Sequence, residues 1–195
     1  MSHANLDDAI PERRQDFSVP SRAMLLSIVG FIAGVVLSFT AVTPGAADRQ
    51  LIERGKYLVT LGGCTDCHTP GYFFGKPDMA RFLGGSEVGF EIPGLGVFHG
   101  PNLTPDNETG LGTWSEQDIV TTIQTGKRPD GRELAPIMPW RAFASLIPGD
   151  AQAIAAYLKS LPAVSNKVPG PFGPSETPAS FVMKVVAPAT TAPAK

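Results

Sequence analysis

Residues 62–70 of this 195-residue chain read Gly-Gly-Cys-Thr-Asp-Cys-His-Thr-Pro, and they contain both of its cysteines. Cys64 and Cys67 are separated by two residues, and His68 follows directly. This Cys-x-x-Cys-His pattern is the attachment sequence of c-type haem. The spacing lets both sulfurs reach the two vinyl groups on one porphyrin edge, while the adjacent imidazole lies beneath the iron. We expect a helical turn here, opened by the two flexible glycines.

Three other interpretations of the cysteines fit the sequence less well. A zinc site of this type needs four ligands, and the chain has no second cysteine pair. A thioredoxin-like redox pair is expected in a strand–helix–strand setting, which the flanking residues do not predict. Chance is a poor explanation, because two cysteines and a histidine fall into one pattern. We therefore predict one covalently bound haem c, with its iron, per chain.

The composition limits the partners and the kind of fold that we expect. The chain carries 16 basic and 18 acidic residues, a net charge of −2, so it offers no broad basic surface and nucleic acid is not an expected partner. Hydrophobic residues make up 43%, enough for a core. The 21 glycines and 19 prolines predict long irregular connections between helices.

An apolar stretch near the N-terminus predicts a membrane segment. Residues 23–42 read AMLLSIVGFIAGVVLSFTAV and carry no charge. About 20 helical residues match the roughly 30 Å hydrocarbon core of a bilayer. We expect an uncleaved transmembrane helix, because residues 1–22 are long and mixed in charge for a signal peptide. Cleavage near Ala47, where small residues suit signal peptidase, stays open as the alternative.

The haem motif sets the expected topology. Haem c is attached to exported protein, so the part after the anchor is predicted to face the periplasm. We expect a single-pass inner-membrane protein with residues 1–22 in the cytoplasm and a haem domain at 48–162. Residues 163–195 form a Pro/Ala-rich extension. Its first half is expected to lie extended on the domain, and its last ten residues are expected to be disordered.

The second axial ligand of the iron is expected from a methionine or histidine beyond the anchor. We favour Met138, because its flanking prolines predict an extended loop that can cross the porphyrin face. It also lies 70 residues after His68, far enough for the chain to wrap around the haem. A Met/His pair favours ferrous iron and fills both axial positions, which suits an electron carrier. The alternatives are Met79, His99 and Met183.

Hydrophobic periodicity predicts two terminal helices that pack around the haem. The first spans residues 48–61, and the second starts at residues 148–150 with Asp150 as its N-cap and ends at Pro162. A glycine in the first helix would let the two approach closely. The residues expected at their crossing are Gly55, Tyr57 and Tyr157.

Two shorter helices are predicted between them. Residues 115–118 resemble a capping box that opens a helix ending at Gly126, and another short helix is expected after Pro139. Residues 71–112 are rich in glycine and aromatic residues and are predicted to be a long loop around the haem edge. A docking face for a dehydrogenase is the alternative use of this loop. The candidate partners of the haem propionates are Trp114 and Arg128.

These motifs resemble those of class I c-type cytochromes, specifically the single-haem cytochromes associated with bacterial periplasmic dehydrogenases. The resemblance covers about residues 51–161. It implies an all-α, class I cytochrome c fold with long irregular loops, preceded here by the N-terminal transmembrane helix. It also implies thioethers at Cys64 and Cys67 and axial ligands His68 and Met138. Related dehydrogenase subunits often carry three such haem motifs, whereas this chain has one. The stretches that carry it are Arg54–Leu58, Gly63–Pro70, Gly100–Pro105, Gly110–Trp114, Arg128–Arg132, Pro136–Pro139 and Ala156–Pro162.

The function implied is that of a single-electron carrier and not of an enzyme. It would take electrons from a periplasmic dehydrogenase and pass them toward the respiratory chain, through an oxidase or another cytochrome. The low net charge predicts modest electrostatic steering of these encounters. Two alternatives stay open: a haem enzyme or gas sensor with an open iron site, and a structural haem subunit that anchors a dehydrogenase complex.

Overall fold

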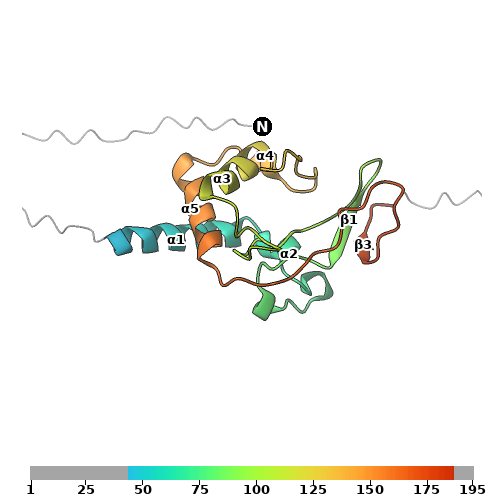
Figure 1. The fold of residues 1–195 in the computed structure, drawn as a ribbon, viewed down its shortest axis with the longest axis horizontal. Coiled ribbons are helices and arrows are strands. Elements are labelled where there is room, and N and C mark those ends of the chain that lie inside the picture. Colours follow the sequence, from blue (N-terminus) through green and yellow to red (C-terminus); the bar gives the residue numbers. More distant parts are fainter. Residues whose placement is uncertain (1–43, 187–195) are drawn as a thin grey trace, which may run out of the picture. The chain divides into compact units, whose positions relative to one another are not determined.

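Helices and three short strands make up the part of the chain that the computed structural model describes, residues 44–186 (Figure 1). The predicted cytoplasmic segment 1–22 and transmembrane helix 23–42 lie outside the described residues. Within residues 44–186, no helix combines the length and the apolar character needed to cross a membrane. The elements are α1 (Pro44–Leu61), α2 (Cys64–His68), two 3-10 turns η2 (Tyr72–Phe74) and η3 (Met79–Arg81), β1 (Val88–Ile92), β2 (Gly96–His99), α3 (Glu116–Thr125), α4 (Trp140–Phe143), α5 (Pro148–Ser160) and β3 (Phe181–Met183).

Helices α1 and α5 cross in close contact at Gly55, as predicted. A Cβ on Gly55 would overlap the backbone carbonyl of Ala153, so a glycine is required at this crossing. Tyr157 is 9% exposed and belongs to the core there. The prediction for Tyr57 was wrong, since this ring is 56% exposed. Tyr57 follows Gly55 by two helical positions, or about 200° around the axis, and therefore faces the opposite side.

Helix α5 begins two residues before the predicted cap. Its N-cap is Ile147, and Pro148 occupies the first turn, where its missing N–H costs no hydrogen bond. Asp150 lies within the helix and was wrongly predicted as the cap. Its carboxylate instead accepts two hydrogen bonds from the Arg54 guanidinium on α1, at 2.9 and 3.0 Å. The helix ends at Ser160, in agreement with the predicted stop at Pro162.

Helix α3 has the predicted ends. The Ser115 side chain accepts from the backbone N–H of Asp118, and the Asp118 carboxylate accepts from the backbone N–H of Ser115, which completes a capping box. The helix stops at Gly126, whose φ of 74° is left-handed and suits glycine. The short helix α4 follows Pro139, also as predicted.

A three-stranded sheet corrects the prediction of an all-α fold: the fold combines helices with a small sheet. The strand order is β2-β1-β3, with β1 antiparallel to β2 and parallel to β3. Phe90 lies opposite Phe98, and Gly94 has the positive φ of the intervening turn. The glycines of segment 71–112 predicted a loop, but aromatic residues facing each other across two strands stabilise a hairpin. β3 comes from the C-terminal extension, so local sequence could not predict its pairing.

The core lies where α1, α3 and α5 meet. Its buried side chains come from the three helices and from two loop positions that close the gap between them, Leu83 and Leu111. Residues from the same helices line the site described below. The cluster consists of Val59, Leu83, Leu111, Ile119, Ile154, Ala155, Tyr157 and Leu158.

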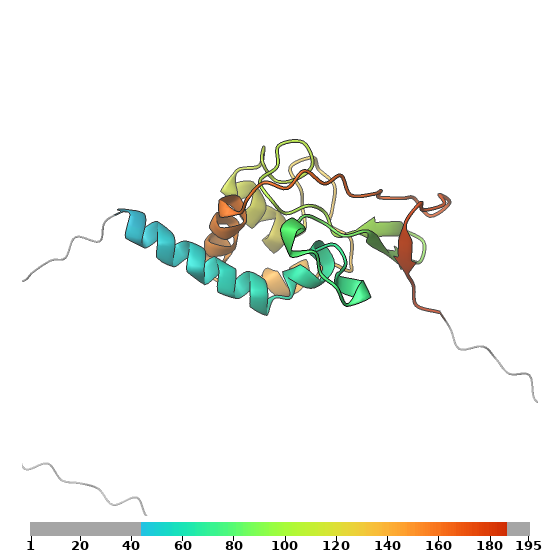
Figure 2. The ribbon, with the colours of Figure 1, turned by 90° about the horizontal axis from the view of Figure 1, so that it is seen from below.

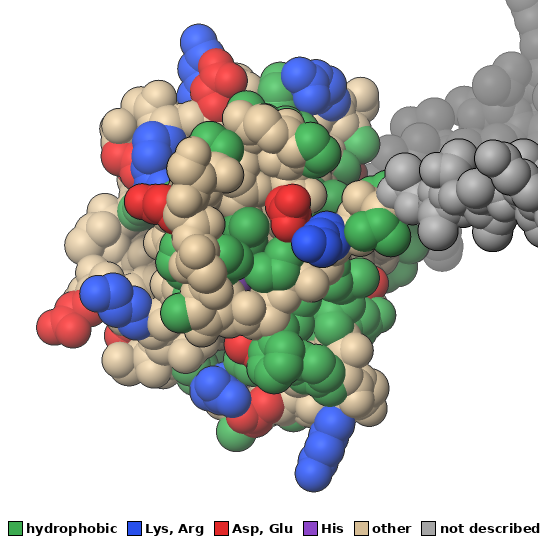
Figure 3. Space-filling view, turned by 90° about the vertical axis from the view of Figure 1, so that its right-hand side faces the viewer, with side chains coloured by type: hydrophobic (Ala, Val, Ile, Leu, Met, Phe, Trp, Pro, Cys, Tyr) green, Lys and Arg blue, Asp and Glu red, His purple; other side chains and the backbone are tan. Residues whose placement is uncertain are grey.

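The chain beyond α5 runs in extended form to the sheet, as Figure 2 shows. This agrees with the expectation for the first half of the extension, while residues 187–195 lie outside the described part. On the face that carries β1 and β3, hydrophobic side chains gather at the surface (Figure 3). Phe74 and Phe181 are both exposed there, with ring centroids 5.0 Å apart. The use of segment 71–112 as a docking face stays a prediction.

Candidate cofactor site

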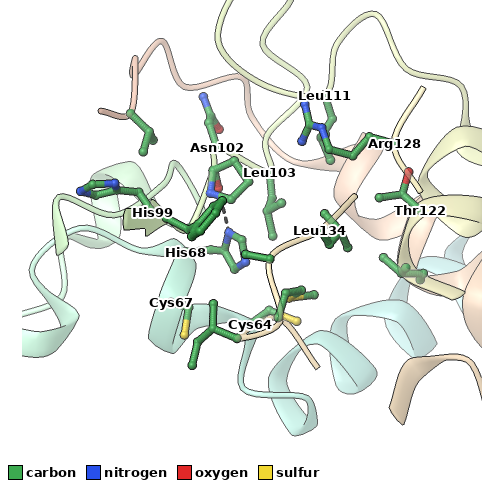
Figure 4. Close-up of a pocket in the computed structure, with 18 of the residues that line it drawn as sticks. Cys64, Cys67, His68, His99, Asn102, Leu103, Leu111, Thr122, Arg128 and Leu134 are labelled. Carbon is green, nitrogen blue, oxygen red and sulfur yellow. Dashed lines mark hydrogen bonds between the residues drawn. The ribbon is translucent and has the colours of Figure 1, made fainter. Parts of the chain in front are cut away.

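A cavity of about 870 Å³ lies between α2, α3, α5 and the loops that connect them. Pockets for cofactors commonly have such volumes and mostly apolar walls. All four predicted site residues, Cys64, Cys67, His68 and Met138, line this one cavity. Figure 4 shows Cys64, Cys67 and His68 grouped at α2, with Asn102 and Leu103 beside them. The structure thus brings together residues up to 74 positions apart, and their roles as cofactor ligands stay predictions.

Helix α2 places the two thiols on one side. It opens after Gly63, whose left-handed φ of 64° makes the sharp entry that the glycine pair predicted. Positions three apart on a helix share a face, and both cysteines line the cavity. Burial raises the pKa of Cys64 to about 11 and also raises that of Cys67. Redox-active cysteines have lowered pKa values, so these thiols do not suit thioredoxin-like chemistry.

His68 is held as a neutral imidazole with a defined tautomer. It is 5% exposed, and its Nδ1 lies 2.8 Å from the carbonyl oxygen of Pro101. A carbonyl only accepts hydrogen bonds, so Nδ1 carries the proton and Nε2 keeps its lone pair. Burial lowers the pKa of His68 although the bond to Pro101 opposes this shift, and the ring is therefore uncharged. Metal-binding histidines typically have this arrangement.

The loop that holds His68 depends on Gly100 and Asn102. A Cβ on Gly100 would overlap the carbonyl of Cys67, so only glycine allows this close approach to α2. Asn102 is buried, and its Oδ1 accepts from the backbone N–H and the hydroxyl of Thr104 at 2.9 and 2.8 Å. Sequence reasoning missed the contact between Pro101 and His68. The string Gly-Pro-Asn was the available signal, but its target lies 33 residues away.

Met138 lies in a tight turn and not in the predicted extended loop. Its N–H donates to the Ala135 carbonyl at 2.9 Å, with Pro136 at the second turn position, which proline favours. Its side chain is half-buried and lines the cavity. Of the alternative ligands, His99 also lines the cavity, whereas the exposed Met79 and Met183 do not.

A cluster of charged residues includes two arginines that line the cavity, Arg128 and Arg132. Arg128 and Trp114, the candidate propionate partners, both line it, and the guanidinium lies 5.0 Å from the ring centroid. Asp130 joins Arg128 to Arg132 through ion pairs of 3.3 and 2.8 Å. Partial burial works against ionisation, but the bonds to Arg132 and the two positive charges lower the pKa of Asp130 to about 2. The two arginines are thus held in place by one carboxylate.

Lys159 ties the loop after Gly110 to α5, a role that the sequence did not predict. Its ammonium group donates to the carbonyls of Leu111, Gly112 and Trp114 at 3.1, 2.9 and 2.8 Å. Leu111 and Trp114 both line the cavity. The lysine therefore fixes part of the cavity wall.

The residues present fit a c-type haem. Two protonated thiols lie on one helix face, and the histidine beside them has a free Nε2 lone pair. A thioether lines the same cavity, and the surrounding walls are mostly apolar. Thiol, imidazole and thioether are the donor groups that attach a haem c and ligate its iron.

Comparisons with known proteins agree with this chemistry. No family model matches the chain. The cytochrome c subunit of the quinone alcohol dehydrogenase of Gluconobacter oxydans (strain 621H) is 34% identical over 149 residues, which are 74% of this chain and 28% of the relative. The gluconate 2-dehydrogenase cytochrome c subunit of Pantoea cypripedii is 34% identical over 134 residues, 69% of this chain and 28% of the relative. The fructose dehydrogenase cytochrome subunit of Gluconobacter japonicus is 34% identical over 114 residues, which are 57% of this chain and 22% of the relative.

The chain spans between a fifth and a third of the length of these relatives. These homologues of the chain are cytochrome subunits of dehydrogenases, and a cytochrome c name implies a covalently bound haem c.

Proposed function

We propose that this chain is a single-electron carrier with one covalently bound haem c. Cys64 and Cys67 would hold the haem through thioethers, and His68 and Met138 would be its axial ligands. When bound, the haem supplies an iron that changes oxidation state by one electron. The observation that carries the proposal is the buried, neutral His68, whose tautomer Pro101 fixes at 2.8 Å. One haem is proposed because the chain contains a single Cys-x-x-Cys-His motif.

The residues around the cavity would favour electron transfer over catalysis. With His68 and Met138 both bound to the iron, a substrate would find no free ligand position there. Apolar side chains such as Leu103 and Leu134 line the walls and exclude water, which limits reorganisation when the charge changes. The Pro101 carbonyl keeps the proton of His68 on Nδ1. The chain is accordingly proposed to be a carrier subunit and not the catalytic one.

A dehydrogenase is the proposed electron donor, and an oxidase or another cytochrome is the proposed acceptor in the respiratory chain. The names of the relatives support the donor. We also propose that residues 23–42 hold the chain in the inner membrane, with the haem domain facing the periplasm. The uncharged length of this segment and the attachment of haem to exported protein support this location.

The first experiment is a visible spectrum of the full chain made with periplasmic haem maturation, after denaturing extraction of loose haem. We expect a retained haem c spectrum with the weak long-wavelength sulfur-to-ferric-iron band. Loss of all haem on extraction would contradict the proposal. Retained haem without that band would shift the ligand assignment to His99 or to an open site. Reduction of the haem when a dehydrogenase substrate is added to membranes would separate a carrier from a structural subunit.

A pair of methionine variants tests the ligand assignment. Met138→Ala should retain the haem but bind added cyanide or carbon monoxide, because one axial position is opened. Met79→Ala is the matched control, since this side chain is exposed and lies outside the cavity. Equal binding by the two variants would show that Met138 is not the ligand.

A further inference from the structure

The chain beyond the last helix forms one wall of the cofactor cavity. We call residues 163–180 the closing segment. Its residues 167–171, Lys-Val-Pro-Gly-Pro, line the cavity, and the segment runs from the end of α5 to the sheet (Figure 2). The two prolines have no N–H and so need no backbone acceptor. The two prolines therefore add apolar surface to this wall without adding backbone donors.

Side chains of the domain hold the closing segment where it leaves α5. Asn102, which also lines the cavity, donates from Nδ2 to the Val164 carbonyl at 2.6 Å. Asn166 donates from Nδ2 to the Gly84 carbonyl at 2.7 Å, and its backbone N–H donates to the Thr109 hydroxyl at 3.1 Å. The closing segment is thus fixed just before it reaches the cavity.

A second set of contacts holds it beyond the cavity. Phe172 and Val97 exchange two backbone hydrogen bonds of 3.0 and 2.9 Å. Further along, the Ser180 hydroxyl lies 2.8 Å from Nε2 of His99, another residue of the cavity wall. Residues 167–171 therefore span between two anchored points.

Two glycines of the domain make room for the closing segment. A Cβ on Gly85 would overlap the side chain of Val168, and a Cβ on Gly96 would overlap the carbonyl of Phe172. Both glycines have positive φ values, 102° and 117°. The backbone of the domain is thus shaped to receive this particular stretch of chain.

We propose that the closing segment is part of the haem site: it seals the cavity against water and thereby raises the reduction potential of the haem. This inference rests on the proposed function. The ferric form carries one more positive charge than the ferrous form, so excluding water disfavours it. An opened segment would admit water and shift the equilibrium toward the ferric form.

The test uses the full chain in haem-loaded form, with two variants that each remove one side-chain contact of an anchor. Asn166→Ala removes the bond to Gly84, and Ser180→Ala removes the contact with His99. Ser165→Ala is the matched control, because this exposed side chain neighbours the first anchor. Backbone hydrogen exchange of residues 166–172 and the reduction potential are measured for each. The parent is also compared with the same chain made without haem maturation.

We expect haem loading to slow exchange in residues 166–172 at least tenfold. Asn166→Ala and Ser180→Ala should each speed this exchange and shift the redox equilibrium about tenfold toward the ferric form, which is about 59 mV. Ser165→Ala should match the parent. If Asn166→Ala does not fold, Ser180→Ala decides alone.

The inference would be overturned if both anchor variants had the reduction potential of the parent. It would also be overturned if haem loading did not change the backbone hydrogen exchange of residues 166–172. Haem retention after denaturing extraction is checked first. A chain that retains no haem refutes the proposed function itself. A chain that retains haem and has parent-like potentials in the variants refutes only the role of the closing segment.

Discussion

Replacing Gly55 by alanine should destabilise the domain, because the two long helices touch there. The added Cβ would overlap the Ala153 carbonyl and lie 2.7 Å from Cβ of Tyr157. Overpacking of this kind costs about 1–3 kcal/mol, and a backbone carbonyl cannot rotate away, which places the cost near 3 kcal/mol. Alanine regains about 1 kcal/mol because it favours the helix more than glycine does. The net loss should be about 2 kcal/mol.

The assay is urea denaturation of the haem-loaded protein, followed by far-ultraviolet circular dichroism. The matched control is Gly149→Ala in α5, where no atom lies within 4 Å of the added Cβ. This control should be neutral or slightly more stable than the parent. A Gly55→Ala protein as stable as the parent would show that α1 and α5 do not meet at this residue. An equal loss of stability in both variants would mean that replacing either glycine destabilises its helix, and that the overlap at Gly55 is not the specific cause.

Two further predictions concern the loops that surround the cavity. Lys159→Met should lower the free energy of unfolding by about 1–3 kcal/mol, because three carbonyls in residues 111–114 lose their donor. The control is Lys56→Met, on the exposed side of α1, in the same denaturation assay. Asp130→Asn should be less stable than the parent above pH 3.8, where the carboxylate is ionised in both folded and unfolded states. This difference should disappear as the pH falls through about 2, the lowered pKa that Arg132 helps to maintain. Thermal unfolding of both proteins across this pH range checks it, and a difference that persisted below pH 2 would show that the charge is not its cause.

Local signals predicted the parts of the fold that are built from neighbouring residues. The capping box at Ser115 and the stop at Gly126 use contacts within four residues, so the sequence alone is sufficient. The Cys-x-x-Cys-His helix is equally local, and its glycine entry at Gly63 was predicted. Gly55 was also predicted correctly, because a glycine within an otherwise regular helix has few explanations other than close packing.

The missed features depend on contacts between distant residues. Asp150 looked like a cap from its neighbours, but Arg54, 96 residues earlier, pairs with it instead. The pairing of β3 with β1 joins residues more than 90 positions apart, and no local pattern specifies such a partner. The bond between His68 and Pro101 also joins distant residues, which are 33 positions apart. The sequence thus singled out candidate residues that line one cavity, whereas the groups that orient them were not predictable from it.

The order of the cavity walls along the chain has a consequence for biosynthesis. A ribosome makes α2, the loops at 100–103 and 134–139, and α5 before it makes residues 167–171. The thiols and the imidazole can therefore be in place while one side of their cavity still lacks its cover. Residues 167–171 are the last part of the cavity wall to be synthesised, so the cavity is complete only after its other sides exist.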